Sequence, residues 1–319
     1  MAKLLSHLCS LVIRTHDADP ILDRAVERAV DRVAPRLKQF RGYPKRYRPA
    51  VQRVVARVRQ LSSDVPGPVT LDAAHYSRDL FVHALFGAAK DITQLCSTPS
   101  MHTYVTQHGR GELYALLSMR RVEKAVFGLE LDGEVLRRDV AQRVNLFTDH
   151  QLIAPAPTEK EARENLLWYL FDHYMEHVAQ GLNRLRDERQ RLAQEKDLAL
   201  ARLRCVSADQ LTARQQELDE LLANLGEASA TLDLDYMGEV FEVVLSHPED
   251  CLALVVQRLS LDTMGVIHAD ATHPGVVPLD FVELHERDRE TRTVVLVHCP
   301  QVNPISSSDR LEEARQLLG

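Results

Sequence analysis

Residues 158–204 read TEKEARENLLWYLFDHYMEHVAQGLNRLRDERQRLAQEKDLALARLR, and this stretch decides the fold that the sequence predicts. Thr158 and Glu161 have the spacing of a capping box, which satisfies backbone N–H groups at a helix N-terminus. No proline follows until Pro248, so nothing stops the helix early. We therefore expect one helix from Glu159 to about Arg204, which would span ~70 Å at about 1.5 Å per residue.

A second leucine-rich segment follows and should pair with this helix. Ser207 and Gln210 give another capping-box pattern, and the apolar spacing continues to Leu225. Residues 183–204 carry seven basic and four acidic side chains, whereas residues 211–225 carry three acidic and one basic. We interpret the two segments as an antiparallel helical hairpin with a coiled-coil seam, serving docking or homo-oligomerisation. The alternative is two helices packed in the main body.

The charge of the chain is distributed unevenly. The 319 residues have a formal net charge of −7, yet residues 206–319 contain 21 acidic and seven basic side chains. The rest of the chain is correspondingly basic. Five well-separated cysteines and no C-x-x-C pair argue against a disulfide framework and favour a reducing, cytoplasmic setting. No apolar run is long enough to predict a transmembrane helix.

The basic character is concentrated between Arg32 and Ser63, which contain ten Arg or Lys and no Asp or Glu. Arg forks suit phosphate groups, and the interspersed Phe40, Tyr43 and Tyr47 could stack on bases. We expect this face to bind nucleic acid, another polyanion or an acidic protein surface. Neutralisation by the chain's own acids is an equally open alternative, and an anionic membrane is a further one. The candidate binding residues are Arg41, Lys45, Arg46, Arg48, Arg53 and Arg57.

The remaining patterns predict a mainly α protein: a multi-helix body, the long hairpin, and a small antiparallel sheet near the C-terminus, α+β overall. The predicted domains are residues 1–157, 158–226 and 227–319, the last with about three strands. Among the expected helices are residues 20–33, 49–61, 70–95, 112–127, 134–147, 235–245, 248–259 and 309–318. The expected strands are residues 264–268, 277–285 and 293–299.

One motif on the long helix could bind zinc. His173, Glu176 and His177 match H-x-x-E-H, which places two histidines one turn apart with a glutamate as general base. Glu239 or Glu242 could supply a third ligand. The alternative is a histidine pair that packs in an apolar helix interface, and the motif is short enough to occur by chance.

A second cluster of possible ligands falls in the strand region. If the three strands form a meander, Val277 pairs with His268 and Leu279 pairs with His298. His268 and His298 would then share a face near the loop that carries Asp270 and His273, as a metal or general-base site. The alternative is polar strand ends that face water.

Motifs of several common enzyme classes are missing from the sequence: there is no G-x-x-x-x-G-K-[ST], no G-x-G-x-x-G after a strand and no G-x-S-x-G. The leading hypothesis is therefore a non-enzymatic interaction or adaptor protein without a cofactor. It would bind a polyanion through the basic face and dock through the hairpin. The alternatives are a zinc-dependent hydrolase and a structural subunit whose charges are neutralised internally.

Overall fold

A computed structural model describes residues 19–132, 135–203, 211–230, 234–269 and 275–302. The chain divides into two compact units. The helical unit contains residues 19–58 and 170–250, and the sheet unit contains residues 59–169 and 251–302. The boundaries fall inside two helices, α3 (Arg48–Asp64) and α8 (Glu159–Leu203). The expected helix at 309–318 and the N-terminal segment lie outside the described residues.

The helical unit begins with α2 (Pro20–Val33), which confirms the helix predicted there. Asp19 caps it by accepting hydrogen bonds from the backbone N–H groups of Ile21 and Leu22, and Pro20 occupies the first turn. A 3-10 helix, η2 (Pro35–Gln39), follows. The buried face of α2 has the predicted helical spacing: Leu22, Ala25, Val26, Ala29, Val30 and Val33.

Buried side chains of α2, α3, α8 and α10 (Leu234–Leu245) form the core of the helical unit. Tyr47, fully buried, meets Phe241 of α10 edge to face, with ring centroids 5.3 Å apart. Tyr174 of α8 is also buried and donates its hydroxyl hydrogen to the carbonyl oxygen of Val244 at 2.7 Å. Such aromatic contacts stabilise the packing beyond the burial of their area.

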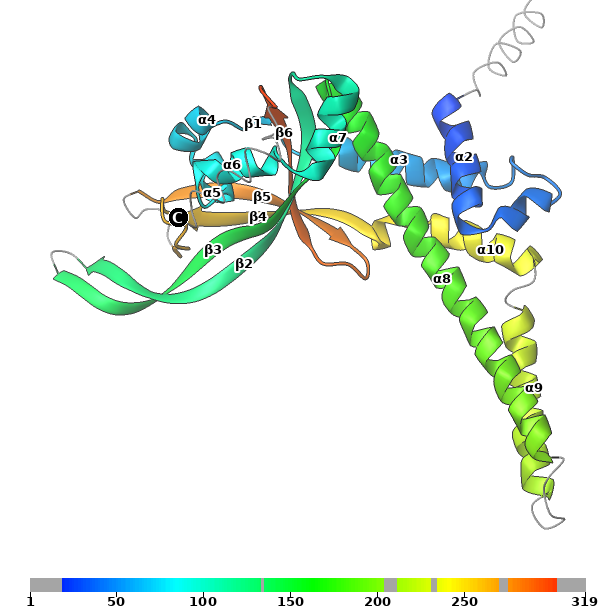
Figure 1. Cartoon of the computed structure of the whole chain (residues 1–319). Coiled ribbons are helices and arrows are strands. Elements are labelled where there is room, and N and C mark those ends of the chain that lie inside the picture. The colour runs from blue at the N-terminus through cyan, green and yellow to red at the C-terminus, as the bar shows by residue number, and fades with distance from the viewer. Residues whose placement is uncertain (1–18, 133–134, 204–210, 231–233, 270–274, 303–319) are drawn as a thin grey trace, which may run out of the picture. The chain divides into compact units, whose positions relative to one another are not determined.

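The α8 helix is the predicted long helix, and α9 (Leu211–Ala230) runs beside its C-terminal half (Figure 1). Leu192 and Ala199 of α8 are buried, as a narrow seam requires. Arg189 of α8 donates to the hydroxyl of Ser229 on α9 at 3.3 Å, so the end of the second arm lies beside the middle of the first.

The sheet unit is built on six strands in the order β3-β2-β6-β5-β4, with β1 pairing in parallel with β6. Four short helices, α4 (Ala73–Arg78), α5 (Leu80–Leu85), α6 (Ala89–Leu95) and α7 (Pro99–His108), contribute to its core. The strands are β1 (Val69–Thr70), β2 (Leu113–Asp132), β3 (Val135–Ala156), β4 (Leu252–Leu261), β5 (Val277–Glu286) and β6 (Arg292–Cys299).

The prediction of a mainly α fold with a small C-terminal sheet is wrong, because the described residues are 54% helical and 27% strand and their two longest strands lie in the first half of the sequence. The helices expected at 112–127 and 134–147 are β2 and β3. Leu113, Ala115, Leu117 and Met119 pack in one hydrophobic core, and side chains that alternate in this way face the same side of a strand. Leu113 pairs with Cys299, so a partner distant in sequence overrides the helical propensity of Ala, Leu and Met.

Three further expectations in the sheet unit are also corrected. The single helix expected at 70–95 is divided, because Asp72 caps α4 and Asp79 caps α5. Residues 248–259 form a 3-10 turn, η3 (Pro248–Asp250), and then β4. Residues 264–268 contribute isolated bridges at Val266 and Ile267.

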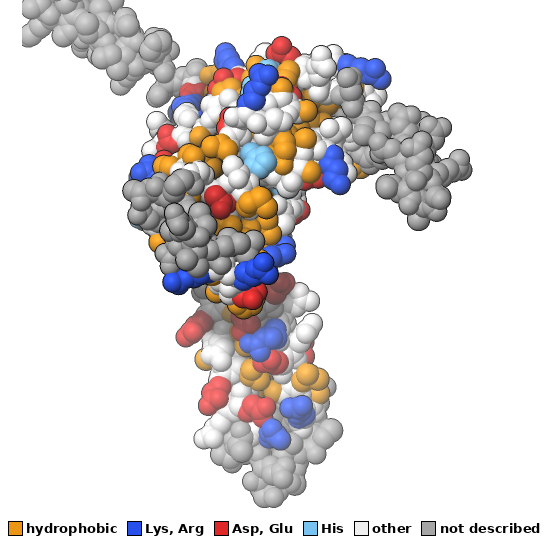
Figure 2. All heavy atoms as spheres, turned by 90° about the vertical axis from the view of Figure 1, so that its left-hand side faces the viewer, with side chains coloured by type: hydrophobic (Ala, Val, Ile, Leu, Met, Phe, Trp, Pro, Cys, Tyr) orange, Lys and Arg blue, Asp and Glu red, His pale blue; other side chains and the backbone are white. Residues whose placement is uncertain are grey.

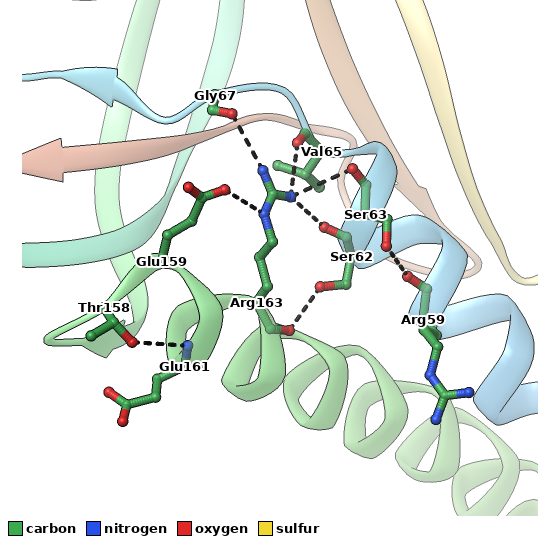
Figure 3. Close-up of polar contacts among 9 residues, drawn as sticks. All are labelled: Arg59, Ser62, Ser63, Val65, Gly67, Thr158, Glu159, Glu161 and Arg163. Atoms are coloured by element: carbon green, nitrogen blue, oxygen red, sulfur yellow. Dashed lines mark hydrogen bonds and ion pairs between the residues drawn. The ribbon is translucent and has the colours of Figure 1, made fainter.

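Arg163 joins the first turns of α8 to the end of α3 (Figure 3). Its guanidinium donates to the carbonyl oxygens of Ser62, Val65 and Gly67 at 2.7, 3.2 and 3.3 Å, and to Glu159 at 2.8 Å. In return, the Ser62 hydroxyl donates to the carbonyl oxygen of Arg163 at 2.7 Å. The last carbonyls of α3 and the turn after it therefore have a cationic partner, which suits the negative end of a helix.

Candidate functional site

The predicted basic face belongs to the helical unit, where several of its cations bind carboxylates of that same unit. Arg46 donates to Glu242 on α10, and its guanidinium lies 4.2 Å from the centroid of the Phe40 ring. The hydrogen bond to Glu242 raises the pKa of Arg46. Arg48 at the start of α3 likewise binds Asp23 of α2. These two candidate residues therefore tie helices together.

Neighbouring cations continue this pattern along α2 and α8. Arg28 makes two hydrogen bonds to Asp172, and this interaction raises the pKa of Arg28. Arg32 lies 3.9 Å from a carboxylate oxygen of Glu176 and 4.0 Å from one of Asp172. Most of these carboxylates lie in the N-terminal two thirds of the sequence, and of those named here only Glu242 comes from the acidic C-terminal part.

The other four candidate residues differ among themselves. Arg53 is exposed and donates a hydrogen bond to the hydroxyl of Ser246 at 2.6 Å. This partner is neutral, so the bond does not neutralise the charge of Arg53. Arg41 and Lys45 are exposed on the loop before α3, and Arg57 is half-buried on α3. Arg46 and Arg48 therefore bind carboxylates, Arg41, Lys45 and Arg53 are exposed, and Arg57 is half-buried.

A larger concentration of positive charge lies in a groove of the helical unit, with a volume of about 890 Å³. It is open at the junction of η2, the middle of α8, the end of α9 and the start of α10. The residues that line it are Ala34, Pro35, Arg36, Arg186, Arg189, Gln190, Ala193, Lys196, Leu225, Ser229 and Met237.

Four of these lining residues are cationic and none is acidic, which gives the groove its electrostatic character. Arg36 makes no ion pair or hydrogen bond with any residue that the structure describes. Arg186 donates to the side-chain oxygen of Asn183 at 2.9 Å, and Arg189 donates to the hydroxyl of Ser229. Both partners are neutral, so these bonds do not neutralise the two arginines. Lys196 lies 3.1 Å from Asp197. Outside the groove, Figure 2 shows side chains of both signs interspersed along the hairpin.

The two halves of this groove lie in separate basic segments of the sequence. Arg36 belongs to the basic run, and Arg186, Arg189 and Lys196 belong to the basic first arm of the hairpin. Their juxtaposition depends on how η2 packs beside α8, about 150 residues later in the chain. A charge count for each segment could have suggested both partners but not their meeting.

The H-x-x-E-H motif lies on α8 within the helical unit. Its Glu176 is near Arg32, and Glu242, a possible third ligand, is bound by Arg46. No group of three or more His, Cys, Asp or Glu side chains that could hold a metal is found among the residues with described positions.

The strand-region cluster is not assembled as expected. Val282 pairs with Val294 in the β5–β6 ladder, so the expected pairing of Leu279 with His298 is wrong. His298 instead stacks on Tyr114, with ring centroids 4.5 Å apart, and lies 3.5 Å from Glu112. His268 lies 3.1 Å from Asp262. Asp270 and His273 fall outside the described residues.

Comparisons with known proteins identify no relative: no protein-family model matches the chain, and no curated protein or solved structure is significantly similar to it. Among the helices that the structure describes, none is both long and apolar enough to cross a membrane.

Proposed function

We propose that this chain is a non-enzymatic interaction protein that binds the phosphate backbone of nucleic acid in the groove between η2 and α8. The α8–α9 hairpin would extend this surface and dock a protein partner or a second copy. The proposal keeps the polyanion expected from the sequence but moves its principal site. It places Arg36, Arg186, Arg189 and Lys196 at the centre, in place of Arg46 and Arg48.

The observation that carries the proposal is the grouping of four cations in one groove, with no acidic side chain among its described lining residues. Arginine forks match phosphate oxygens bidentately, and a concave basic surface attracts an anion more strongly than scattered charges do. Leu225 and Met237 add apolar surface that a base or ribose could contact. The exposed Arg41, Lys45 and Arg53 could lengthen the track for a polymer.

Fluorescence anisotropy tests the proposal with three labelled probes: 20-nucleotide single-stranded DNA, the same sequence as RNA, and duplex DNA. Each is titrated at 50 and 200 mM NaCl. The triple variant Arg36→Glu, Arg186→Glu, Arg189→Glu should bind at least about tenfold more weakly at the lower salt. For a single strand, losing three phosphate contacts should reduce the slope of log affinity against log salt by about 2.

A matched variant separates the groove from the rest of the basic surface. Arg41→Glu, Lys45→Glu, Arg53→Glu changes the net charge by the same amount but alters no lining residue. It should weaken binding less than the groove variant does. Equal losses would move the site back to the basic segment, and no binding by the unaltered protein at 50 mM NaCl would reject nucleic acid as the ligand.

A second candidate function has its own support. The pairs Arg46–Glu242 and Arg48–Asp23 use cations of the basic run within the helical unit, and Arg28–Asp172 adds a neighbouring one. A structural subunit of a larger assembly would need no more than this. In that case the groove variant would leave nucleic-acid binding unchanged, while variants of the paired cations would lose stability.

A further inference from the structure

The sheet unit contains a second cavity that none of the arguments above uses. It has a volume of about 350 Å³ and lies between the α4–α6 segment, β3 and the turn after β4. Its wall is mainly apolar, with buried Leu85, Phe86, Phe147 and Leu261. Cavities of this size and composition are typical of sites for small molecules.

Asn145 of β3 lines this cavity and carries an unusual polar group. Its residue exposure is 3%, and neither its amide oxygen nor its amide nitrogen has a hydrogen-bond partner among the residues that the structure describes. The backbone is satisfied, because Asn145 N–H donates to the carbonyl oxygen of Gly265 at 2.8 Å. A buried amide without partners is costly, so a polar side chain at this position calls for something that pairs with it.

Three other polar side chains around the cavity already have partners, and a fourth, Thr263, is exposed to solvent. The hydroxyl of Tyr76 donates to the carbonyl oxygen of Gly87 at 3.2 Å, and His83 Nε2 lies 3.1 Å from that of Thr263. Asp262 accepts from the backbone N–H groups of Met264 and Val266 and lies 3.1 Å from His268 Nε2. Asn145 therefore holds the unused hydrogen-bonding capacity, one acceptor and one donor group side by side.

We propose that this cavity binds a small, neutral, mainly apolar molecule with an adjacent donor and acceptor, such as a carboxamide on an aromatic ring. The ring would pack among Phe86, Phe147 and Leu279, and its carboxamide would pair with Asn145. Neutrality follows from the described lining residues, whose one acidic member, Asp262, is engaged within its own turn.

Entry requires a small movement of the wall, because the amide atoms of Asn145 are covered in the structure. The turn from Asp262 to Gly265 is the segment suited to this movement. Its Met264 residue is 79% exposed and so has little packing to lose. Leu80 of α5, 41% exposed, lies at another part of the rim.

Ligand-observed NMR titrations of the full chain test this inference with benzamide, acetophenone and benzoate. Acetophenone has nearly the shape of benzamide but lacks the donor, and benzoate adds a charge. Benzamide should bind at least about tenfold more tightly than either, because a site that offers a hydrogen bond rejects an analogue that cannot complete it. In Asn145→Leu this preference should vanish, with acetophenone bound at least as well as benzamide.

The stability of Asn145→Leu supplies an independent readout. Removing an unpaired buried amide should raise the melting temperature of the free protein, which fluorescence of Trp168 in the sheet unit reports. A lowered melting temperature would mean that an internal water already satisfies the amide, and the proposal would fall. An intact preference for benzamide in this variant, or no binding of benzamide to the unaltered protein, would also overturn it.

A pair of leucine variants tests the cavity without changing Asn145, in case Asn145→Leu does not fold. Leu80→Trp should fill the rim and abolish binding of benzamide while leaving Asn145 in place. Leu222→Trp is the matched control, because Leu222 is similarly exposed at 46% but lies on α9 outside the cavity. Loss of binding in the control alone, or equal binding in all three proteins, contradicts the assignment.

Discussion

The helical unit and the sheet unit use charge in different ways. In the helical unit, Arg46 and Glu242 pair with side chains 26% and 35% exposed, so water screens much of their attraction. In the sheet unit, Glu283 is a buried carboxylate, 8% exposed, and meets Arg121 at 2.8 Å. Charge pairs at half-exposed helix surfaces can be exchanged for a ligand, whereas charges within a sheet are committed to the fold.

This difference between the two units also indicates where positive charge is available to a polyanion. The helical unit has more basic side chains than its carboxylates neutralise in the contacts described above, and the surplus gathers in the groove lined by Arg36 and Arg189. The sheet unit keeps Arg121 between Glu283 and Glu123, and Arg292 against Asp149. We therefore expect polyanion binding to depend on the helical unit and global stability to be more sensitive to charges in the sheet unit.

The largest expected effect concerns Arg121. Arg121→Ala would leave Glu283 buried without its cation, which should lower the free energy of unfolding by about 3 kcal/mol. Denaturant titration followed by Trp168 fluorescence measures this in the sheet unit. The double variant Arg121→Met, Glu283→Leu should recover most of the loss, because it removes both charges. A double variant as unstable as the single one would show that the pair contributes through its shape and not its charge.

An intermediate effect is expected at Arg163. Arg163→Ala removes donors from the carbonyl oxygens of Ser62, Val65 and Gly67, and we expect a loss of about 2 kcal/mol by the same fluorescence titration. Arg163→Lys should restore part of it, since an ammonium can reach fewer of these carbonyls. The control is Arg191→Ala, whose arginine binds Glu188 and Glu195 on an exposed face of α8. A midpoint shift in the control as large as that of Arg163→Ala would refute the special role of Arg163.

The smallest effect is expected in the helical unit. Arg46→Ala loses the bond to Glu242 and the contact with Phe40, which together should stabilise the folded state by about 1 kcal/mol. Faster hydrogen exchange of the α10 amides would report it, and the acceleration should shrink at 0.5 M NaCl because the pair is half-exposed. Lys45→Ala, at the neighbouring exposed position, should leave the exchange unchanged. If the acceleration in Arg46→Ala did not depend on salt, the Arg46–Glu242 pair would be shielded from solvent as Arg121–Glu283 is.

The parts of the fold that the sequence predicted are those set by local signals. Asp19-Pro20 marks the start of α2, and Thr158 marks the start of α8, because a capping side chain acts within three residues of its own position. The uninterrupted apolar run before Cys299 similarly predicted β6. Each of these signals needs no knowledge of the rest of the chain.

The missed parts depend on partners far away in sequence. The segment from Leu113 to Met119 is rich in good helix formers, and it becomes a strand because β6 pairs with it from about 180 residues later. The meeting of Arg36 with Arg189 is non-local in the same sense. Asn145 could not be singled out either, since an orphaned amide is recognised only when its neighbours are known.

The hairpin of β2 and β3 has a consequence for how this protein behaves at high concentration. β2 pairs with β6 only as far as Met119, yet β2 and β3 continue their ladder to Asp132 and Val135. Along this extension the outer side of β2 has no neighbouring strand among the described residues, so its backbone groups could accept a strand from another chain. Phe127 is 78% exposed there, and such an addition would bury its apolar surface. Arg120 and Lys124 would oppose the addition through like-charge repulsion. Self-association through this ribbon thus depends on whether charge repulsion along the edge of β2 outweighs the pairing that the exposed edge offers.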